Sequence, residues 1–252
     1  MLRATRSFAV SYAAATCIGG RESNEDSVLA LELDSRYCFV VADGLGGHGA
    51  GDIASKLLTG IFEREFGNAK DCRGFLKHAF DVAQQELLAL QAEKGAVNQM
   101  KTTAVAACII NGKIAWGHAG DSRLYHYKKG ILAGRTLDHS VPQMLVASGE
   151  IKEDEIAKHP DRSRLLRAFG DKWDVPKYEI SKEVNLRKNS AFLLCTDGIW
   201  EHVSKEILMP PKDVDANADS WLAAIMDDMT RLQDIDSEID MDNYSVISVI
   251  VR

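Results

Sequence analysis

The sequence predicts an α+β fold in which antiparallel sheets carry helices on their outer faces. Short apolar or alternating segments are typical of strands, and three longer segments have the periodicity of amphipathic helices. The strands and helices do not alternate as β-α-β units, so a parallel sheet is not expected. Two turns, Asn111-Gly112 and Lys129-Gly130, join neighbouring strand segments directly, and Asn-Gly in particular favours an antiparallel hairpin.

The elements follow in the order three strands, two long helices, a strand meander, an irregular stretch, a strand, a helical region and a last strand. Apolar residues recur at helical spacing in the helices, as Ile53, Leu57 and Ile61 do in the first. Residues 140–170 contain helical patterns without a regular period. The expected strands are 7–16, 27–33, 36–42, 103–110, 113–118, 122–128, 191–196 and 244–251, and the expected helices are 50–66, 71–93 and about 218–233.

Length and composition limit the class of protein. The chain has 252 residues, 46% of them hydrophobic, and α/β and sandwich folds of this length often form one unit, so we expect 1–252 to be a single domain. The 37 acidic and 30 basic residues give a net charge of -7, which argues against binding to nucleic acids or membranes. A ligand that carries phosphate must therefore be attracted locally, by a cation or an arginine.

The cysteines and the apolar runs predict where the protein works. There are five cysteines, an odd number, and none has the Cys-x-x-Cys spacing, which indicates free thiols in a reducing compartment. No apolar run approaches the ~20 residues that a membrane-spanning helix needs. The first residues become polar too quickly for a signal peptide. We expect a cytoplasmic protein.

Acidic residues stand directly before or after several predicted strands. A strand end holds a side chain more rigidly than a mobile loop does, which is what a preorganised site requires. One Asp-Gly pair after a strand is most often only a turn, but its repetition favours a functional site. The acids are Glu25 and Asp26 before the second strand, Asp43 and Asp197, each followed by a glycine, and Asp242 before the last strand.

Carboxylates that meet in one cleft repel each other and need either protons or a cation. Oxygen ligands without histidine or cysteine beside them suit Mg²⁺ or Mn²⁺ rather than Zn²⁺. A glycine after the acid allows its carbonyl to face a metal and leaves room for a ligand. Arg21 precedes the Glu25-Asp26 pair, and it can serve either as their ion-pair partner or as a bidentate phosphate ligand.

Competing motifs fit less well. The run from Gly44 to Gly49 matches Gly-x-Gly-x-x-Gly, but the aspartate before it would oppose a pyrophosphate, and a second helix rather than a strand follows the first. The sequence has no Gly-Lys-Ser/Thr, which excludes a P-loop. The acidic run 234–243 lacks the glycine and the closing glutamate of a calcium loop, so Asp242 is its functional candidate.

With these residues in place, the chain resembles the metal-dependent phosphatases of the protein phosphatase 2C family, in their compact bacterial form. The resemblance covers about residues 8–251; each motif alone is weak, but eight in this order are specific. The motifs are GGRESNED (19–26), VVADGLGGHGAG (40–51), TTAV (102–105), HAGDSRLYHY (118–127), TLDHS (136–140), RLLRAFG (164–170), LLCTDGIWEHVS (193–204) and DNYSVISV (242–249).

The resemblance implies a four-layer α-β-β-α sandwich with two central antiparallel sheets and a metal cleft at one end. It implies two Mn²⁺ or Mg²⁺ ions, with a third, weaker one in bacterial members, and hydrolysis of phosphoserine or phosphothreonine in proteins by a metal-activated water. The implied roles are Asp43 as the bridge between two ions, Asp197 and Asp242 on the first ion, the carbonyl of Gly44 on the second, Glu25 and Asp26 in direct or water-mediated contact, Asp121 on the weaker ion, and Arg21 on the substrate phosphate.

Residues 140–170 match the family's flap beside the cleft, where protein substrates are contacted, and His159 is our substrate-binding candidate there. Eukaryotic members have a histidine directly after the first Asp-Gly, where this chain has Leu45. His48 is the nearest substitute as a catalytic acid, and a metal-bound water is the alternative. His139 is expected to be a structural hydrogen-bonding residue. Ser163 stands where many bacterial relatives have asparagine.

Two further functions stay open beside the phosphatase. One is a catalytically silent binding protein of the same fold, although such relatives usually lack one of the metal acids and this chain has the whole set. The other is a phosphoesterase that acts on small molecules. We expect a monomer that acts on phosphorylated proteins and opposes a bacterial serine/threonine kinase.

Overall fold

The computed structural model describes residues 8–46, 50–213, 216–235 and 241–252. It contains two large antiparallel sheets with helices outside them, which confirms the predicted fold class. The strands are β1 (Val10–Cys17), β2 (Ser27–Leu33), β3 (Arg36–Ala42), β4 (Gly44–Leu45), β5 (Lys101–Thr102), β6 (Ala104–Ile110), β7 (Lys113–Ala119), β8 (Arg123–Lys128), β9 (Ile131–Arg135), β10 (Glu179–Ile180), β11 (Val184–Asn185), β12 (Ser190–Cys195) and β13 (Tyr244–Val251). The helices are α1 (Ala50–Phe66), α2 (Cys72–Glu93), α3 (Val141–Ser148), η1 (Glu153–Lys158), α4 (Asp197–Trp200) and α5 (Ala218–Ile235).

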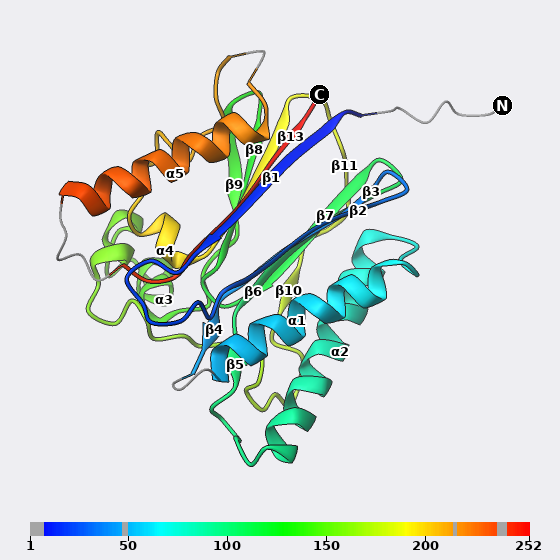
Figure 1. The fold of residues 1–252 in the computed structure, drawn as a ribbon, viewed down its shortest axis with the longest axis vertical. Helices are drawn as coiled ribbons and strands as arrows, with labels where there is room; N and C mark the ends of the chain where they lie inside the picture. Colours follow the sequence, from blue (N-terminus) through cyan, green and yellow to red (C-terminus); the bar gives the residue numbers. More distant parts are fainter. Residues whose placement is uncertain (1–7, 47–49, 214–215, 236–240) are drawn as a thin grey trace.

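The two sheets lie face to face between the helices (Figure 1). One sheet has the order β1-β13-β12-β8-β9, and the other has the order β10-β7-β6-β3-β2, with β11 also paired to β7. The first and last strands are neighbours, because β1 pairs with β13 from Val10 opposite Val251 to Cys17 opposite Tyr244. The short strands β4 and β5 form a separate pair.

Three hydrophobic clusters hold the four layers together. On β3, Phe39 and Val41 face the other sheet, whereas Cys38 and Val40 face α1 and α2. Both faces of the strand are therefore buried, and its sequence is a continuous apolar run rather than an alternating one. The third cluster lies between the other sheet and the helices α4 and α5, with Trp221 at its centre.

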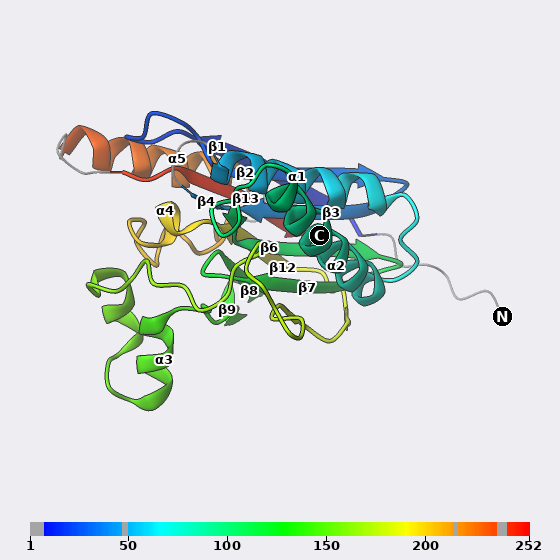
Figure 2. The same cartoon turned by 90° about the horizontal axis from the view of Figure 1, so that it is seen from below.

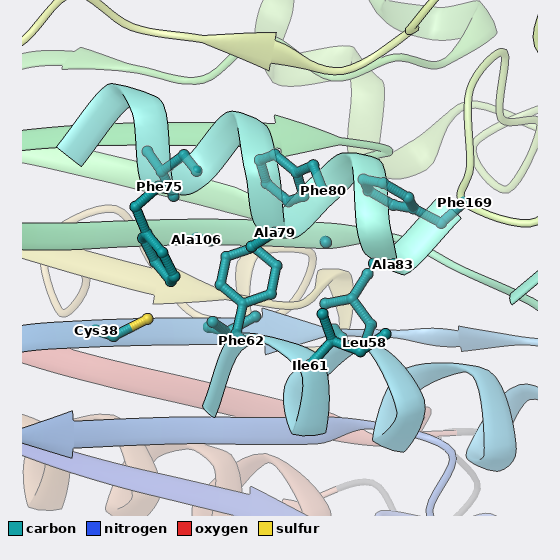
Figure 3. Packing of buried hydrophobic residues seen from close by; sticks show 14 of the residues in the cluster. Cys38, Leu58, Ile61, Phe62, Phe75, Ala79, Phe80, Ala83, Ala106 and Phe169 are labelled. Carbon is teal, nitrogen blue, oxygen red and sulfur yellow. The ribbon is translucent and has the colours of Figure 1, made fainter. Parts of the chain in front are cut away.

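Aromatic side chains fix α1 and α2 against the second sheet (Figure 3). Phe62 of α1 contacts Phe75 and Phe80 of α2 edge to face, with ring centroids 5.6 and 5.1 Å apart. Phe80 in turn stacks on Phe169, which lies at the C-terminal end of residues 140–170. Asp71 begins α2 by accepting a hydrogen bond from the backbone N–H of Gly74.

The hairpin turns have the backbone that the sequence predicts. A two-residue turn between antiparallel strands favours positive φ at both residues, because this twist matches that of the strands. The turns are Asn111 (φ 52°) with Gly112 (φ 68°), Lys129 (φ 52°) with Gly130 (φ 75°), and Asp34 (φ 51°) with Ser35 (φ 58°), the last of which has no glycine to indicate it.

The flap, residues 140–170, stands beside the sandwich at the end where β4 and α4 lie (Figure 2). Its first helix begins at Ser140, whose side chain caps α3, and ends at Gly149 in the left-handed conformation with φ 79°. Its base is closed by a β-bridge between Ser140 and Leu165, and a further bridge joins Thr102 to Phe169. The first bridge thus closes the flap on itself, and the second attaches its C-terminal end to β5.

The boundaries differ from the predicted ones in small ways. The predicted strand 7–16 begins at Val10, and residue 7 lies outside the described residues. The short strands β4, β5, β10 and β11 were not predicted, because two-residue strands carry no periodicity. None of the described helices is long and apolar enough to cross a lipid bilayer.

Candidate active site

The predicted acids meet at one end of the sandwich, around a cavity of about 410 Å³. They come from five separate places in the chain, next to β2, β3, β8, β12 and β13. The flap contributes Ser163 and Leu165 to the wall. The acids that line the cavity are Glu25, Asp43, Asp121, Asp197 and Asp242, together with Arg21.

Two threonines hold the backbone of Asp43. The backbone N–H of Thr103 and the hydroxyl of Thr102 both donate to the carbonyl oxygen of Asp43, at 2.8 and 2.9 Å. The N–H of Asp43 donates to the Thr103 hydroxyl at 3.2 Å. The Thr-Thr pair therefore fixes the peptide on both sides of Asp43 and leaves its side chain directed by the rigid end of β3.

Gly44 lies against two neighbouring backbone segments. Its N–H donates to the carbonyl of Glu25 at 3.1 Å, and a Cβ at this position would meet Glu25 O and Gly51 O at 2.4 Å. A Cβ at Gly51 would come 2.4 Å from Glu25 Oε2. Glycine is required at both positions because the start of α1, the Glu25 loop and the end of β3 approach each other too closely for a side chain.

A substitution at Gly44 tests this close approach. We expect Gly44→Ala to displace the Glu25 and Gly51 backbones, to lower the melting temperature and to weaken Mn²⁺ binding at least tenfold, as changes around metal ligands often do. Gly60→Ala in α1 is the matched control, because a Cβ there meets nothing within 4 Å and alanine favours the helix. Calorimetric Mn²⁺ titrations measure both variants, and equal affinities would contradict the prediction.

Asn243 organises the loop that carries Arg21 and Glu25. Its side-chain amide donates to the carbonyls of Ile18 and Ser23, at 2.8 and 2.9 Å, and its Oδ1 accepts from the N–H of Glu25 at 2.8 Å. Asn243 was not among the predicted site residues. Its position between Asp242 and the last strand is the one signal that could have indicated it.

Arg21 and Asp242 form an ion pair across the mouth of the cavity. Arg21 Nη2 lies 3.0 Å from Asp242 Oδ2, and the two side chains are 45% and 49% exposed. An ion pair this exposed contributes little to stability. Asp242 therefore holds the guanidinium of Arg21 at the cavity through a weak ion pair, and an anion with more charge, such as a phosphate, can take the place of Asp242 in that pair.

Asp26 lies beneath the cavity, next to Asp197. Its Oδ2 accepts a hydrogen bond from the hydroxyl of Thr196 at 3.1 Å, and that hydroxyl accepts from the N–H of Ser245 at 3.0 Å. Thr196 immediately precedes Asp197, so one side chain links the ends of three strands.

Burial and mutual repulsion raise the pKa values of the acids at the cavity. Burial, followed by repulsion from Asp197, raises the pKa of Asp43 well above its ordinary value. The same two causes raise the pKa of Asp121, and burial raises that of Asp26 to about 7. Burial and repulsion from Asp242 raise the pKa of Asp197 to about 6. At neutral pH the folded chain thus holds several carboxylates that repel each other.

The residues fit a hard divalent cation. Two buried carboxylate oxygens, Asp26 Oδ1 and Asp121 Oδ1, have no hydrogen-bond partner among the described residues. A buried anionic oxygen without a partner is costly, and a cation would satisfy it. The donors at the cavity are oxygen atoms, the ligand type that Mn²⁺ and Mg²⁺ prefer.

One predicted site residue does not join this group. His159 does not line the cavity, and its Nδ1 instead accepts a hydrogen bond from the N–H of Asp161 within the flap. His48 lies outside the described residues. Glu201, which was not predicted, lies one helical turn after Asp197; burial and then repulsion from Asp197 raise its pKa to about 7.

The comparisons agree with this geometry. The family model of protein phosphatase 2C matches residues 15–233. The chain belongs to the protein phosphatase 2C family. This confirms the family and the enzyme class that the motifs predict.

The chain is similar to the serine/threonine phosphatase stp of Listeria monocytogenes, with 29% identity over 80% of this chain and 84% of that protein. It is similar to the crystal structure of the Mycobacterium tuberculosis phosphatase PstP/Ppp, with a TM-score of 0.79 and 27% identity over 96% and 98% of the two chains. A PstP catalytic domain solved with two manganese ions also has a TM-score of 0.79, with 25% identity over 97% and 99% of the chains.

Proposed function

We propose that this phosphatase removes phosphate from phosphoserine and phosphothreonine in proteins, using two Mn²⁺ or Mg²⁺ ions held by the carboxylates around the cavity. The observation that carries the proposal is the convergence of acids from five strand ends around one cavity, with two buried carboxylate oxygens unpaired. Membership of the family and the manganese-bound relative support it.

In this proposal Asp43 would be shared by the two ions, Asp197 and Asp242 would hold the first, and the carbonyl of Gly44 would hold the second. Glu25 and Asp26 contribute directly or through water, and Asp121 holds a third, weaker ion. Bound divalent ions would supply positive charge that activates a water and offsets charge on the phosphoryl oxygens. The Thr102–Thr103 and Asn243 hydrogen bonds hold these ligands in position before substrate arrives.

Arg21 binds the phosphate in this proposal. The phosphate oxygens would accept hydrogen bonds from the guanidinium, which in the structure contacts Oδ2 of Asp242 instead. Leu45, which lines the cavity, has no proton to donate. The proton for the leaving serine or threonine oxygen would then come from His48 or from a metal-bound water.

A prediction for Arg21 follows. We expect Arg21→Ala to lower kcat/KM for a phosphopeptide about 10- to 100-fold, because a charge-assisted hydrogen bond is typically worth ~1.5–3 kcal/mol. Arg21→Lys should recover only part of this loss, since lysine keeps the charge but not the two-pronged geometry. Arg187→Ala, at an exposed position before β12, is the control for loss of a positive charge. Steady-state kinetics measure all three, and a change below twofold in Arg21→Ala would refute the assignment.

The decisive experiment for the function compares substrates. The purified protein with Mn²⁺ is expected to hydrolyse phosphoserine and phosphothreonine peptides faster than nucleotides or sugar phosphates, and EDTA should abolish the reaction. Preference for a small molecule would favour the phosphoesterase alternative. Tight Mn²⁺ binding without turnover of any phosphate ester would favour the silent binding protein.

We also propose that the chain forms a single catalytic domain, acts as a monomer in the cytoplasm and opposes a bacterial serine/threonine kinase. All five cysteines are free thiols and four of them are buried, which supports a reducing compartment. A comparison of phosphoproteomes with and without the gene would identify the substrate proteins.

A further inference from the structure

A cluster of titratable side chains lies beside the active site but outside the cavity. His118, His139 and Glu179 offer three possible metal-ligand atoms within 4.8 Å of one another. The two imidazole rings stack, with centroids 4.4 Å apart and an angle of 15° between their planes. Both histidines are buried, and Glu179 is exposed.

The hydrogen bonds of this cluster do not suit a metal ion. The N–H of Gly120 donates to Nδ1 of His139 at 3.3 Å, and Nε2 of the same ring lies 3.2 Å from Glu179 Oε1 and 3.1 Å from Nη1 of Arg167. Nη1 of Arg167 lies 3.1 Å from the same carboxylate oxygen. Arg167 therefore already provides, next to Nε2 and Glu179, the positive charge that a cation would supply, and the lone pair of Nδ1 is already used by the N–H of Gly120.

The cluster instead holds the backbone next to Asp121. His139 makes two contacts with Gly120, since its own N–H also donates to the Gly120 carbonyl at 2.9 Å. Gly120 has φ 105°, and a Cβ there would lie 2.6 Å from Cβ of Thr103. The glycine is thus enclosed between His139 on one side and the Thr103 that fixes Asp43 on the other.

The other side of Asp121 is held just as firmly. The hydroxyl of Ser122 lies 2.7 Å from that of Thr103, and the carbonyl of Asp121 accepts a hydrogen bond from Nε1 of Trp200 at 3.0 Å. The contacts of His139 and Trp200 fix the main chain, whereas Oδ1 of the Asp121 side chain is buried without a partner among the described residues. A backbone held at three points with one side-chain oxygen left unpaired indicates a ligand that is oriented in advance.

His139 also joins this backbone to the flap. Its carbonyl accepts the N–H of Leu166 at 2.7 Å, and Arg167, which contacts the His139 ring, is the next residue of the flap. A shift of the flap base would therefore move the peptide that precedes Asp121.

We propose that His139 is a positioning residue, which fixes the backbone of Gly120, the residue before Asp121, through its Nδ1 acceptor and its own N–H so that Asp121 can hold a divalent ion, and which ties this backbone to the base of the flap. The inference rests on the proposed function in assigning an ion to Asp121. It goes beyond that function by giving the TLDHS histidine a defined task outside the cavity.

The test compares two substitutions of His139. His139→Asn keeps an acceptor oxygen near the position of Nδ1, whereas His139→Phe keeps a flat ring over His118 and loses the acceptor. The relevant measurement is the Mn²⁺ binding step that is lost in Asp121→Asn. We expect His139→Phe to weaken the affinity of this step about tenfold, and His139→Asn to weaken it less than about twofold. Isothermal titration calorimetry measures this binding without turnover.

A double-mutant cycle separates positioning from general destabilisation. In an Asp121→Asn background, His139→Phe should have no further effect on Mn²⁺ binding, because the ligand that it positions is already absent. An equal effect in both backgrounds, or equal effects of the Phe and Asn substitutions, would overturn the proposal. If His139→Phe does not fold, His139→Leu and the Asn variant provide the same comparison. If the effects of His139 and Asp121 on Mn²⁺ binding are coupled as expected but the protein hydrolyses no phosphopeptide, only the proposed function is contradicted.

Discussion

Replacing Asp43 by asparagine is expected to abolish phosphatase activity and to stabilise the metal-free protein at the same time. Activity should fall about 10³-fold or more, because the proposed bridging ligand loses its charge. The free energy of unfolding of the metal-free protein should rise, because burial and the neighbouring acids disfavour the charged form of Asp43 and raise its pKa. An asparagine of the same shape removes that repulsion.

The opposite signs of these two effects make the test specific. The melting temperature in EDTA should increase by a few degrees, since ~1 kcal/mol corresponds to roughly 2–4 °C in a chain of this size. The additional stabilisation that Mn²⁺ gives the wild-type protein should be largely lost. Asp34→Asn is the matched control, because Asp34 lies in the exposed turn between β2 and β3, far along the strand from Asp43. A metal-free Asp43→Asn protein that is less stable than wild type would contradict the electrostatic account.

The second large effect is a dependence of stability on pH that divalent ions remove. Burial raises the pKa of Asp26 from 3.8 to about 7, and burial with repulsion from Asp242 raises that of Asp197 to about 6. The folded state therefore binds protons more tightly than the unfolded state does. The stability from these protons is fully present below about pH 4 and is lost as the pH rises through 6 to 7.

The expected change in the free energy of unfolding is large for a single carboxyl group. Ionisation of Asp26 in the metal-free protein costs the folded state on the order of 4 kcal/mol, because a pKa difference of one corresponds to about 1.4 kcal/mol. Urea unfolding in EDTA should give a free energy of unfolding that decreases from pH 5 to pH 8, and the decrease should be smaller in Asp26→Asn. Saturating Mn²⁺ should reverse the trend, since ions bind the ionised carboxylates. A metal-free stability that is constant or increases across this range would refute the prediction.

The fold was largely predictable because its signals are local. The apolar periods of α1 and α2 and the Asn111-Gly112 turn depend on neighbouring residues alone, and the structure places these elements where they were expected. The two-residue strands β4 and β5 were missed because they exist only where Gly44 and Thr102 meet across a long sequence separation. Asp34-Ser35 forms a similar turn without the glycine that usually indicates one.

The site was predictable in its charged residues but not in their supports. An aspartate directly after an apolar strand is visible in the sequence, and the cavity brings Asp43, Asp197 and Asp242 together. The contacts of Thr102, Asn243 and His139 were not predictable, because each joins segments that are adjacent only in the folded chain. The flap position of His159 gave no indication that its ring would bond within the flap.

Local patterns were enough to predict the longer helices and strands, the family and the acidic site residues. Strand periodicity, turn chemistry and the motifs are properties of short segments, and they can be read without the fold. Tertiary structure alone decided that these acids share one cavity, that burial and mutual repulsion raise their pKa values, and that Asp121 keeps an unpaired oxygen while its backbone is held at three points. The physical reason is that repulsion, desolvation and hydrogen bonding between distant segments depend on distances that no local pattern encodes.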